Sequence, residues 1–217
     1  MALTLLIGNK NYSSWSLRPW LAMKVAGIDF REELIPLDAP DFKARVGRVS
    51  GSGKVPALID GEVQVWESLA IIEHLAEKFP QARLWPADPA ARGHARALAA
   101  EMHAGFSALR RECPMNMRRA VKPRELSAEA MGDIGRIAAL WTVCRQRFGG
   151  EGAFLCGAFG AVDAMYAPIV SRLHTYAVDV APAARAYMAA VMALPAWQEW
   201  RQAALAEPWV RPNSEVD

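Results

Sequence analysis

The hydrophobic pattern of this chain changes once, between residues 81 and 89, and that change limits what the chain can fold into. Before it, short apolar runs alternate with segments whose apolar residues recur at helical spacing, which predicts an α/β unit. After it, the pattern stays helical, rich in alanine and broken at prolines and glycines. The stretch between, with Pro86 and Pro89, reads as a linker. We expect an α/β domain over residues 1–80, a linker over 81–89 and an all-helical domain over 90–217.

The predicted elements of the first 80 residues follow the order βαβ, short helix, β-hairpin, helix. The first unit implies parallel strands joined by a right-handed crossover, and the hairpin implies an antiparallel edge. Asp60-Gly61 is a dipeptide favoured in hairpin turns, and Gly27 and Pro80 end the two longer helices. The predicted strands are 3–7, 30–37, 57–59 and 63–65, and the predicted helices are 17–25, 41–46 and 69–79.

Charge and composition exclude several classes of protein. The net charge is only +2, which does not favour nucleic acid or a membrane surface as a partner. No apolar run approaches the roughly 20 residues of a membrane helix, and the N-terminus lacks the pattern of an export signal. The 3 cysteines are widely spaced without a CxxC pair, which is typical of a reducing compartment and argues against a disulfide framework. The histidines have no metal-ligand spacing, so we expect a cytoplasmic protein without a metal site.

The first segment with chemical potential is Asn11-Tyr12-Ser13-Ser14-Trp15-Ser16, between the first strand and the first helix. Pro19 fits best within the first turn of that helix, which makes Ser16 its expected N-cap. Ser13 and Ser14 then lie just upstream, where free N–H groups and the helix dipole favour negative charge. Taken alone, this segment is better explained as a capping loop.

Two further segments follow in the same half. Val55-Pro56 enters the third strand; a cis bond there would turn the backbone of Val55 outward to pair with an extended peptide, but an ordinary trans proline is the simpler interpretation. Glu67-Ser68 opens the helix after the hairpin. Free N–H groups and the Ser68 hydroxyl suit a carboxylate, and Glu67 suits an ammonium group beside it. Helix capping by Ser68 is the alternative.

Together these segments are far more specific than any one of them. In order and spacing, SGKVPALIDGEVQVWESLAIIEHLAEKFP (52–80) resembles the N-terminal domain of cytosolic glutathione transferases, whose fold is thioredoxin-like. SSWSLRPWLAMKVAGIDF resembles the serine-bearing first helix of that family, nearest to its zeta-like and other bacterial serine branches. FLCGAFGAVDAMYAPIVSRL (154–173) is similar to the central helix of its C-terminal domain. Residues 90–150 match the family only in their general helical character and not in any motif.

The resemblance implies a role for each matching residue. Ser13 aligns with the residue that activates the glutathione thiol, with Ser14 the nearest substitute and Tyr12 a more distant one. The other implied roles are the backbone of Val55 for the cysteinyl part, Pro56 as the family's cis-proline, Glu67 and Ser68 for the γ-glutamyl end, Lys54 or less surely Lys43 for the glycine carboxylate, and Asp163 as a structural residue. It further implies glutathione as cosubstrate, a small electrophile as second substrate, and a homodimer.

The sequence departs from the family pattern at three positions. Gly160 stands where a Ser or Thr normally caps the central helix, so its capping box is half missing; a glycine cap costs only a few tenths of a kcal/mol. Trp15 stands where the zeta branch has cysteine, and Glu67 where it usually has glutamine. These two differences argue against the isomerase activity of the zeta branch.

We expect the electrophile pocket between the two halves. Residues 102, 106 and 110 form one helical stripe, a spacing that more often indicates core packing than the lining of a pocket. The candidates are Tyr12, Trp15, Met102, Phe106, Arg110, Met115 and Asn116. The predicted function is a glutathione transferase in which a serine hydroxyl donates a hydrogen bond to the thiolate. A glutathione-dependent isomerase, dehalogenase or peroxidase on the same fold, and a non-catalytic glutathione-binding or regulatory protein, are the alternatives.

Overall fold

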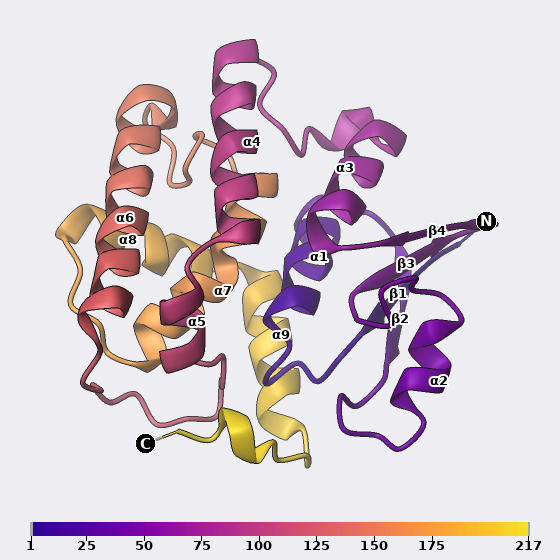
Figure 1. The fold of residues 1–217 in the computed structure, drawn as a ribbon. Coiled ribbons are helices and arrows are strands. Elements are labelled where there is room, and N and C mark those ends of the chain that lie inside the picture. The colour runs from indigo at the N-terminus through magenta and orange to yellow at the C-terminus, as the bar shows by residue number, and fades with distance from the viewer. Residues whose placement is uncertain (1, 217) are drawn as a thin grey trace.

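The computed structural model describes residues 2–216, which form an α/β half followed by a helical half (Figure 1). The order of elements follows the predicted one. The first half contains β1 (Leu3–Ile7), α1 (Ser14–Val25), β2 (Phe30–Leu34), α2 (Phe42–Gly47), β3 (Ala57–Asp60), β4 (Val63–Trp66) and α3 (Ser68–Lys78). The second contains α4 (Pro89–Ala104), α5 (Ser107–Glu112), α6 (Ala128–Cys144), α7 (Ala161–Thr175), α8 (Pro182–Met192) and α9 (Pro195–Ala206). Short turns are η1 (Pro80–Ala82), the π-helical η2 (Arg145–Gly149) and η3 (Pro212–Ser214).

The four strands form one sheet in the order β2-β1-β3-β4. β1 and β2 are parallel, while β1–β3 and β3–β4 are antiparallel. Because β1 lies between two strands with both faces covered, all five of its residues are buried, and its sequence LTLLI is almost continuously apolar. The edge strand β2 carries Arg31, Glu32 and Glu33, as is typical of an edge that must not pair further. The thioredoxin-like α/β half and the helical half are therefore both confirmed.

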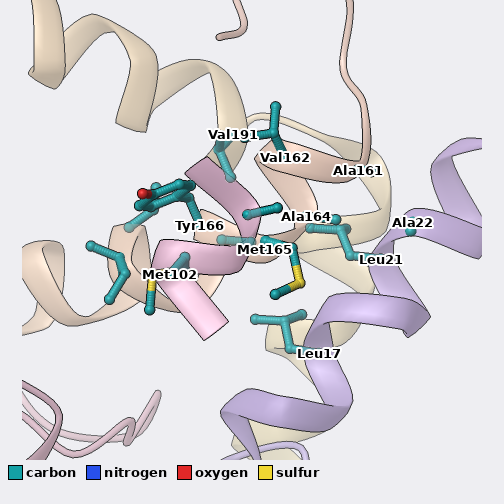
Figure 2. Packing of buried hydrophobic residues seen from close by; sticks show 14 of the residues in the cluster. Leu17, Leu21, Ala22, Met102, Ala161, Val162, Ala164, Met165, Tyr166 and Val191 are labelled. Carbon is teal, nitrogen blue, oxygen red and sulfur yellow. The ribbon is translucent and has the colours of Figure 1, made fainter. Parts of the chain in front are cut away.

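α1 and α3 cover the sheet face turned toward the helical half, and α2 covers the opposite face (Figure 1). α1 is buried on nearly every side because it also packs against α7. Figure 2 shows Leu17 and Leu21 of α1 directed at Met165 of α7. The main hydrophobic core is continuous through this contact and includes residues of both halves. A smaller core lies under α2, around Leu6 and Val46.

Two predicted boundaries were wrong. The first helix begins at Ser14 with Ser13 as N-cap, not after Ser16, because the Ser13 hydroxyl accepts a hydrogen bond from the Ser16 amide. Pro19 consequently lies inside the helix rather than in its first turn. The second strand ends at Leu34 rather than at Leu37, since Pro36 has no N–H to donate and the Leu37 amide bonds to the Asn9 side chain.

Among residues 2–216, no helix combines the length and the apolar character needed to cross a membrane.

Candidate functional site

A cavity of about 270 Å³ lies where α1, the Val55 loop, the start of α3 and the end of α4 meet. It brings together residues that are far apart in the sequence, and five of them are sequence-predicted site residues. Its lining consists of Trp15, Ser52, Lys54, Val55, Pro56, Glu67 and His103. His103, from α4, is the member contributed by the helical half. The cavity is thus the meeting place of the Val-Pro and Glu-Ser segments.

The Val55–Pro56 peptide bond is cis. Val55 precedes β3, and its side chain is buried in the smaller core. Within residues 2–216, its backbone N–H and C=O have no hydrogen-bond partner. An extended peptide lying along the cavity would find both groups free, as it would at a sheet edge.

The start of α3 is built differently from the capping interpretation. Glu67, not Ser68, is the N-cap residue, with φ at 70°, and among the described residues no side chain caps the first-turn amides. Ser68 is the first helical residue and is fully buried; its hydroxyl accepts from Arg18 at 3.5 Å. A non-glycine residue in left-handed backbone costs of order 1–3 kcal/mol and is found mainly at functional sites. Free amides and a positive dipole end therefore stand beside a carboxylate that borders the cavity.

The Glu67 carboxylate lies 3.4 Å from Nε2 of His103. Burial, followed by the charge of Arg18, lowers the pKa of His103, while Glu67 acts in the opposite direction. The lowered pKa favours a neutral ring at pH 7.

The three serines of the first loop make different contacts. The Ser13 hydroxyl donates to Ser16 Oγ at 2.7 Å, and Ser16 Oγ accepts in turn from the amide of Gly8. Ser14 Oγ accepts from Nη2 of Arg172 at 3.1 Å, which turns it toward α7. Ser13 and Ser14 are each only 6% exposed, and neither is among the residues that line the cavity. They lie at the start of α1, immediately before Trp15, which does line it.

Three arginines surround this start of α1. The guanidinium of Arg18 lies 4.1 Å from the centre of the Trp15 ring, and that of Arg110 lies 4.7 Å from it. Burial, with the charges of Arg110 and Arg172 next, holds the pKa of Arg18 well below its usual value. Burial likewise lowers the pKa of Arg172 to about 10. Because none of these three arginines forms an ion pair within residues 2–216, this part of the site carries excess positive charge.

Sequence reasoning missed Arg18, Arg172 and His103. For Arg18 a signal existed, because a charged residue within the apolar run of the first helix indicates a specific structural or functional role. Arg172 lies within the 154–173 stretch, but the resemblance there implied a role only for Asp163, and His103 lies in the 90–150 region, which contains no motif.

The expected electrophile-pocket residues do not gather around the cavity, apart from Trp15. Met102, Phe106 and Met115 are buried in the main core. The supposed stripe 102–106–110 is not one helical face, because α4 ends at Ala104, α5 begins at Ser107, and Phe106 between them has φ at 61°. Arg110 stacks on Trp15 and donates to the carbonyl of Gly105.

Tyr12 and Asn116 lie beneath the C-terminal segment. The Tyr12 hydroxyl bonds to Glu215 and accepts from Arg118. Asn116 bonds to the Asn11 side chain and to Glu215. Of the two lysines considered for the glycine carboxylate, Lys54 borders the cavity and the exposed Lys43 does not.

Asp163 occupies the position of the family's structural aspartate. Its carboxylate is fully buried and accepts from the amides of Leu155 and Gly160 at 3.0 and 2.9 Å. Burial raises its pKa to about 6, and the two amides act against that rise. Only this half of a capping box exists, because Gly160 has no side chain. A Cβ there would lie 2.8 Å from the Leu84 carbonyl oxygen, which explains why glycine is present.

Comparison with known proteins agrees with this geometry. Residues 12–78 match the family model described as "Glutathione S-transferase, N-terminal domain". A "Probable maleylacetoacetate isomerase" from Caenorhabditis elegans is 37% identical over 97 residues, which cover 44% of this chain and 44% of that protein. A "Stringent starvation protein A homolog" from Pasteurella multocida is 30% identical over 145 residues, covering 64% of this chain and 63% of that one. The chain thus spans less than two thirds of either relative.

The fold comparison covers nearly the whole chain. A crystal structure of a glutathione transferase homolog from Burkholderia GL BGR1, with bound glutathione, superposes with a TM-score of 0.70 over 95% of this chain and 100% of that one. At 22% identity this likeness shows the shared fold.

Proposed function

We propose that this chain, whose residues 12–78 match the N-terminal domain of the glutathione S-transferase family, binds glutathione in the Trp15–His103 cavity and activates the thiol for attack on a small electrophile. The observation that carries the proposal is the joint presence, around one cavity, of an unpaired Val55 backbone, an uncapped α3 and the Glu67 carboxylate. A γ-linked tripeptide presents the complementary groups: an extended cysteinyl backbone, and an α-amino acid end with both charges.

Recognition of the peptide part rests on Val55 and Lys54. The free N–H and C=O of Val55 pair with the cysteinyl residue as an added strand would. Lys54 borders the same cavity and carries the charge that suits the glycine carboxylate. Its side chain is exposed, so this pair adds little affinity on its own.

Recognition of the γ-glutamyl end rests on the start of α3. Its first-turn amides and dipole suit the α-carboxylate, and the Ser68 hydroxyl, held by the buried Arg18, lies at the same helix end. The Glu67 carboxylate suits the α-ammonium group. A ligand carboxylate here would also give the buried Arg18 a nearby counter-charge, which lowers the cost of burying its guanidinium.

Activation of the thiol is assigned to Ser13, with Ser14 beside it. Ser13 caps α1, so a sulfur at its hydroxyl lies at the positive end of the helix dipole. A free thiol titrates at about 8.5, and the thiolate is the nucleophile. Ser13 donates a hydrogen bond to that thiolate and is not itself the nucleophile.

The test is calorimetric titration of the full chain with glutathione. We expect micromolar to low-millimolar binding, weakened about tenfold in Glu67→Gln because the hydrogen bond from the ligand ammonium group then goes to a neutral amide oxygen instead of a carboxylate. Glu62→Gln is the matched control, since Glu62 is exposed in the neighbouring hairpin and does not border the cavity. Absence of binding to the unmodified chain refutes the proposal. Binding with an unshifted thiol pKa leaves a glutathione-binding protein and refutes the catalytic part.

One relative favours a second candidate. The matched stretch of the Caenorhabditis elegans protein named as a probable maleylacetoacetate isomerase makes glutathione-dependent isomerisation the alternative reaction. Trp15, where the zeta branch has cysteine, is our reason for placing it second. Turnover of maleyl-type substrates without net consumption of glutathione would reverse this order.

A further inference from the structure

The fold brings together two cysteines that the sequence separates by 12 positions. Cys144 ends α6, and Cys156 lies in the segment between η2 and α7. Their sulfur atoms are 3.7 Å apart, and the Cys144 thiol also lies 3.4 Å from the carbonyl oxygen of Leu155. Cys144 is fully buried and Cys156 is partly exposed. Of the two residues, only Cys156 therefore has surface exposed to solvent.

The backbone around the pair is held on both sides. Arg145 bonds to the carbonyl oxygens of Gly152 and Ala153. Isolated bridges join Phe154 to Gly157 and Cys156 to Ala158. The Leu155 amide is fixed by Asp163 at 3.0 Å. A disulfide has an S–S distance of about 2.05 Å, so closing the gap requires each sulfur to move by roughly 0.8 Å, within the range of small side-chain rotations.

We propose that Cys144 and Cys156 form a reversible intramolecular disulfide, with a low-molecular-weight disulfide such as glutathione disulfide as oxidant. In the first step the Cys156 thiolate attacks one sulfur of the oxidant, the oxidant's S–S bond breaks, and one glutathione thiolate leaves and takes up the proton lost by Cys156. In the second step Cys144 attacks Sγ of Cys156, and the mixed disulfide breaks. A second glutathione leaves and takes up the proton lost by Cys144. One protein dithiol and one glutathione disulfide thus give one protein disulfide and two glutathiones.

The order of the steps follows from exposure and from the distance between the two sulfurs. Only Cys156 is reached from solvent, so it forms the mixed disulfide. A hydrogen bond from the Cys156 thiol lowers the pKa of Cys144, and the same bond raises the pKa of Cys156. That hydrogen bond is lost once Cys156 carries glutathione, and Cys144 then resolves the mixed disulfide because its sulfur lies beside Sγ of Cys156, 3.7 Å away in the reduced chain. The third cysteine, Cys113, takes no part, because it is fully buried and burial raises its pKa to about 11.

The disulfide would tie the end of α6 to the segment that leads into α7. Because α7 packs against both α1 and α4, this link reinforces the part of the helical half that supports the first half. Closing a loop in the unfolded chain stabilises the folded state. The oxidised protein should therefore unfold at a higher temperature than the reduced protein.

The test is equilibration of the reduced full chain with glutathione disulfide, read by thiol counting and intact mass. The expected result is a fall from three titratable thiols to one, a mass loss of two hydrogens, a peptide pair linking Cys144 to Cys156, and full reversal by dithiothreitol. Cys113→Ser is the matched control and should still form the disulfide. Cys144→Ser should instead accumulate a glutathione adduct on Cys156, and Cys156→Ser should keep its thiols.

Three results would overturn the proposal: three free thiols in the unmodified chain at equilibrium, a stable glutathione adduct on Cys156 despite the presence of Cys144, or a crosslink that involves Cys113. The experiment does not depend on glutathione binding in the Trp15–His103 cavity, so its outcome is separate from that of the proposed function.

Discussion

Removal of the Ser13 hydroxyl is the sharpest test of thiol activation. In the structure, the Ser13 proton is donated to Ser16 Oγ at 2.7 Å. When the bound thiol ionises, that proton must turn from Ser16 to the sulfur. Ionisation therefore exchanges a neutral hydrogen bond for one to a charged acceptor. Ser13→Ala removes both bonds, so its effect on the thiol pKa is the difference between them.

The magnitude follows from that exchange. A neutral hydrogen bond contributes about 0.5–1.5 kcal/mol, and one to a charged group contributes about 1.5–3 kcal/mol. The difference is about 1–1.5 kcal/mol, which corresponds to about one pKa unit. The dipole of α1 remains in the variant and supplies about 0.3–1 kcal/mol. We therefore expect the pKa of bound glutathione to rise by about one unit in Ser13→Ala while staying below the pKa of the free thiol.

The assay is the ultraviolet absorbance of the thiolate, followed against pH at saturating glutathione. Ser13→Thr keeps a hydroxyl and a capping oxygen, and should keep most of the depression. Ser13→Ala also loses the N-cap of α1, at a cost of about 1 kcal/mol in folding free energy, so each titration needs an unfolding curve beside it. Ser171→Ala, a buried serine that borders a different cavity, is the control for loss of a hydroxyl.

An unchanged thiol pKa in folded Ser13→Ala would refute the mechanism. A larger shift in Ser14→Ala than in Ser13→Ala would refute the assignment to Ser13. That second outcome has a physical route, since Ser14 Oγ accepts from Arg172 and its own proton has no acceptor among the described residues.

Three further changes test the structure around the site. The pKa of His103 is lower in the folded chain than in the unfolded chain, so the unfolded chain binds the proton more tightly. The contribution of His103 to stability is therefore present above about pH 6.5 and is lost as pH falls through the folded pKa. Urea unfolding at pH 5 and 7 should show a smaller loss of unfolding free energy at the lower pH in His103→Gln than in the unmodified chain. The pH dependence due to Asp163 runs in the opposite direction. Because its pKa is raised from 3.8 to about 6, its contribution to stability is present below pH 3.8 and is lost, by about 3 kcal/mol, as pH rises through 6. Asp163→Asn should remove this change of unfolding free energy with pH in the same assay. Gly160→Ser should lower stability by about 1–3 kcal/mol in thermal unfolding, because the new Cβ meets the Leu84 carbonyl; a more stable variant would contradict this.

The elements of the first half were predictable because their signals are local. β1 is a continuous apolar run, the hairpin has Asp60-Gly61 at its turn, and α3 ends where Pro80 begins the next turn. The start of α1 was not, since Ser13, Ser14 and Ser16 are all good caps and only the folded loop decides among them. The Ser16 hydroxyl is taken by Gly8, and that contact joins residues 8 positions apart.

The residues of the candidate site fall into the same two groups: those with a local sequence signal and those whose position only the fold determines. Its loop residues were found because each stands in a short motif, whereas part of the positive charge at the start of α1 comes from elements that the chain brings together only on folding: Arg110 from α5, which stacks on Trp15, and Arg172 from α7, which bonds to Ser14. The capping of α7 makes the point most clearly. The sequence predicted only that glycine at position 160 forgoes a cap hydroxyl at small cost, which treats the residue as a tolerated defect. The folded chain places the Leu84 carbonyl where a side chain would stand and uses that oxygen to accept from the Ala161 amide at 2.7 Å. A backbone acceptor from the segment between the halves thus lies at the start of α7, and glycine is the residue that admits it.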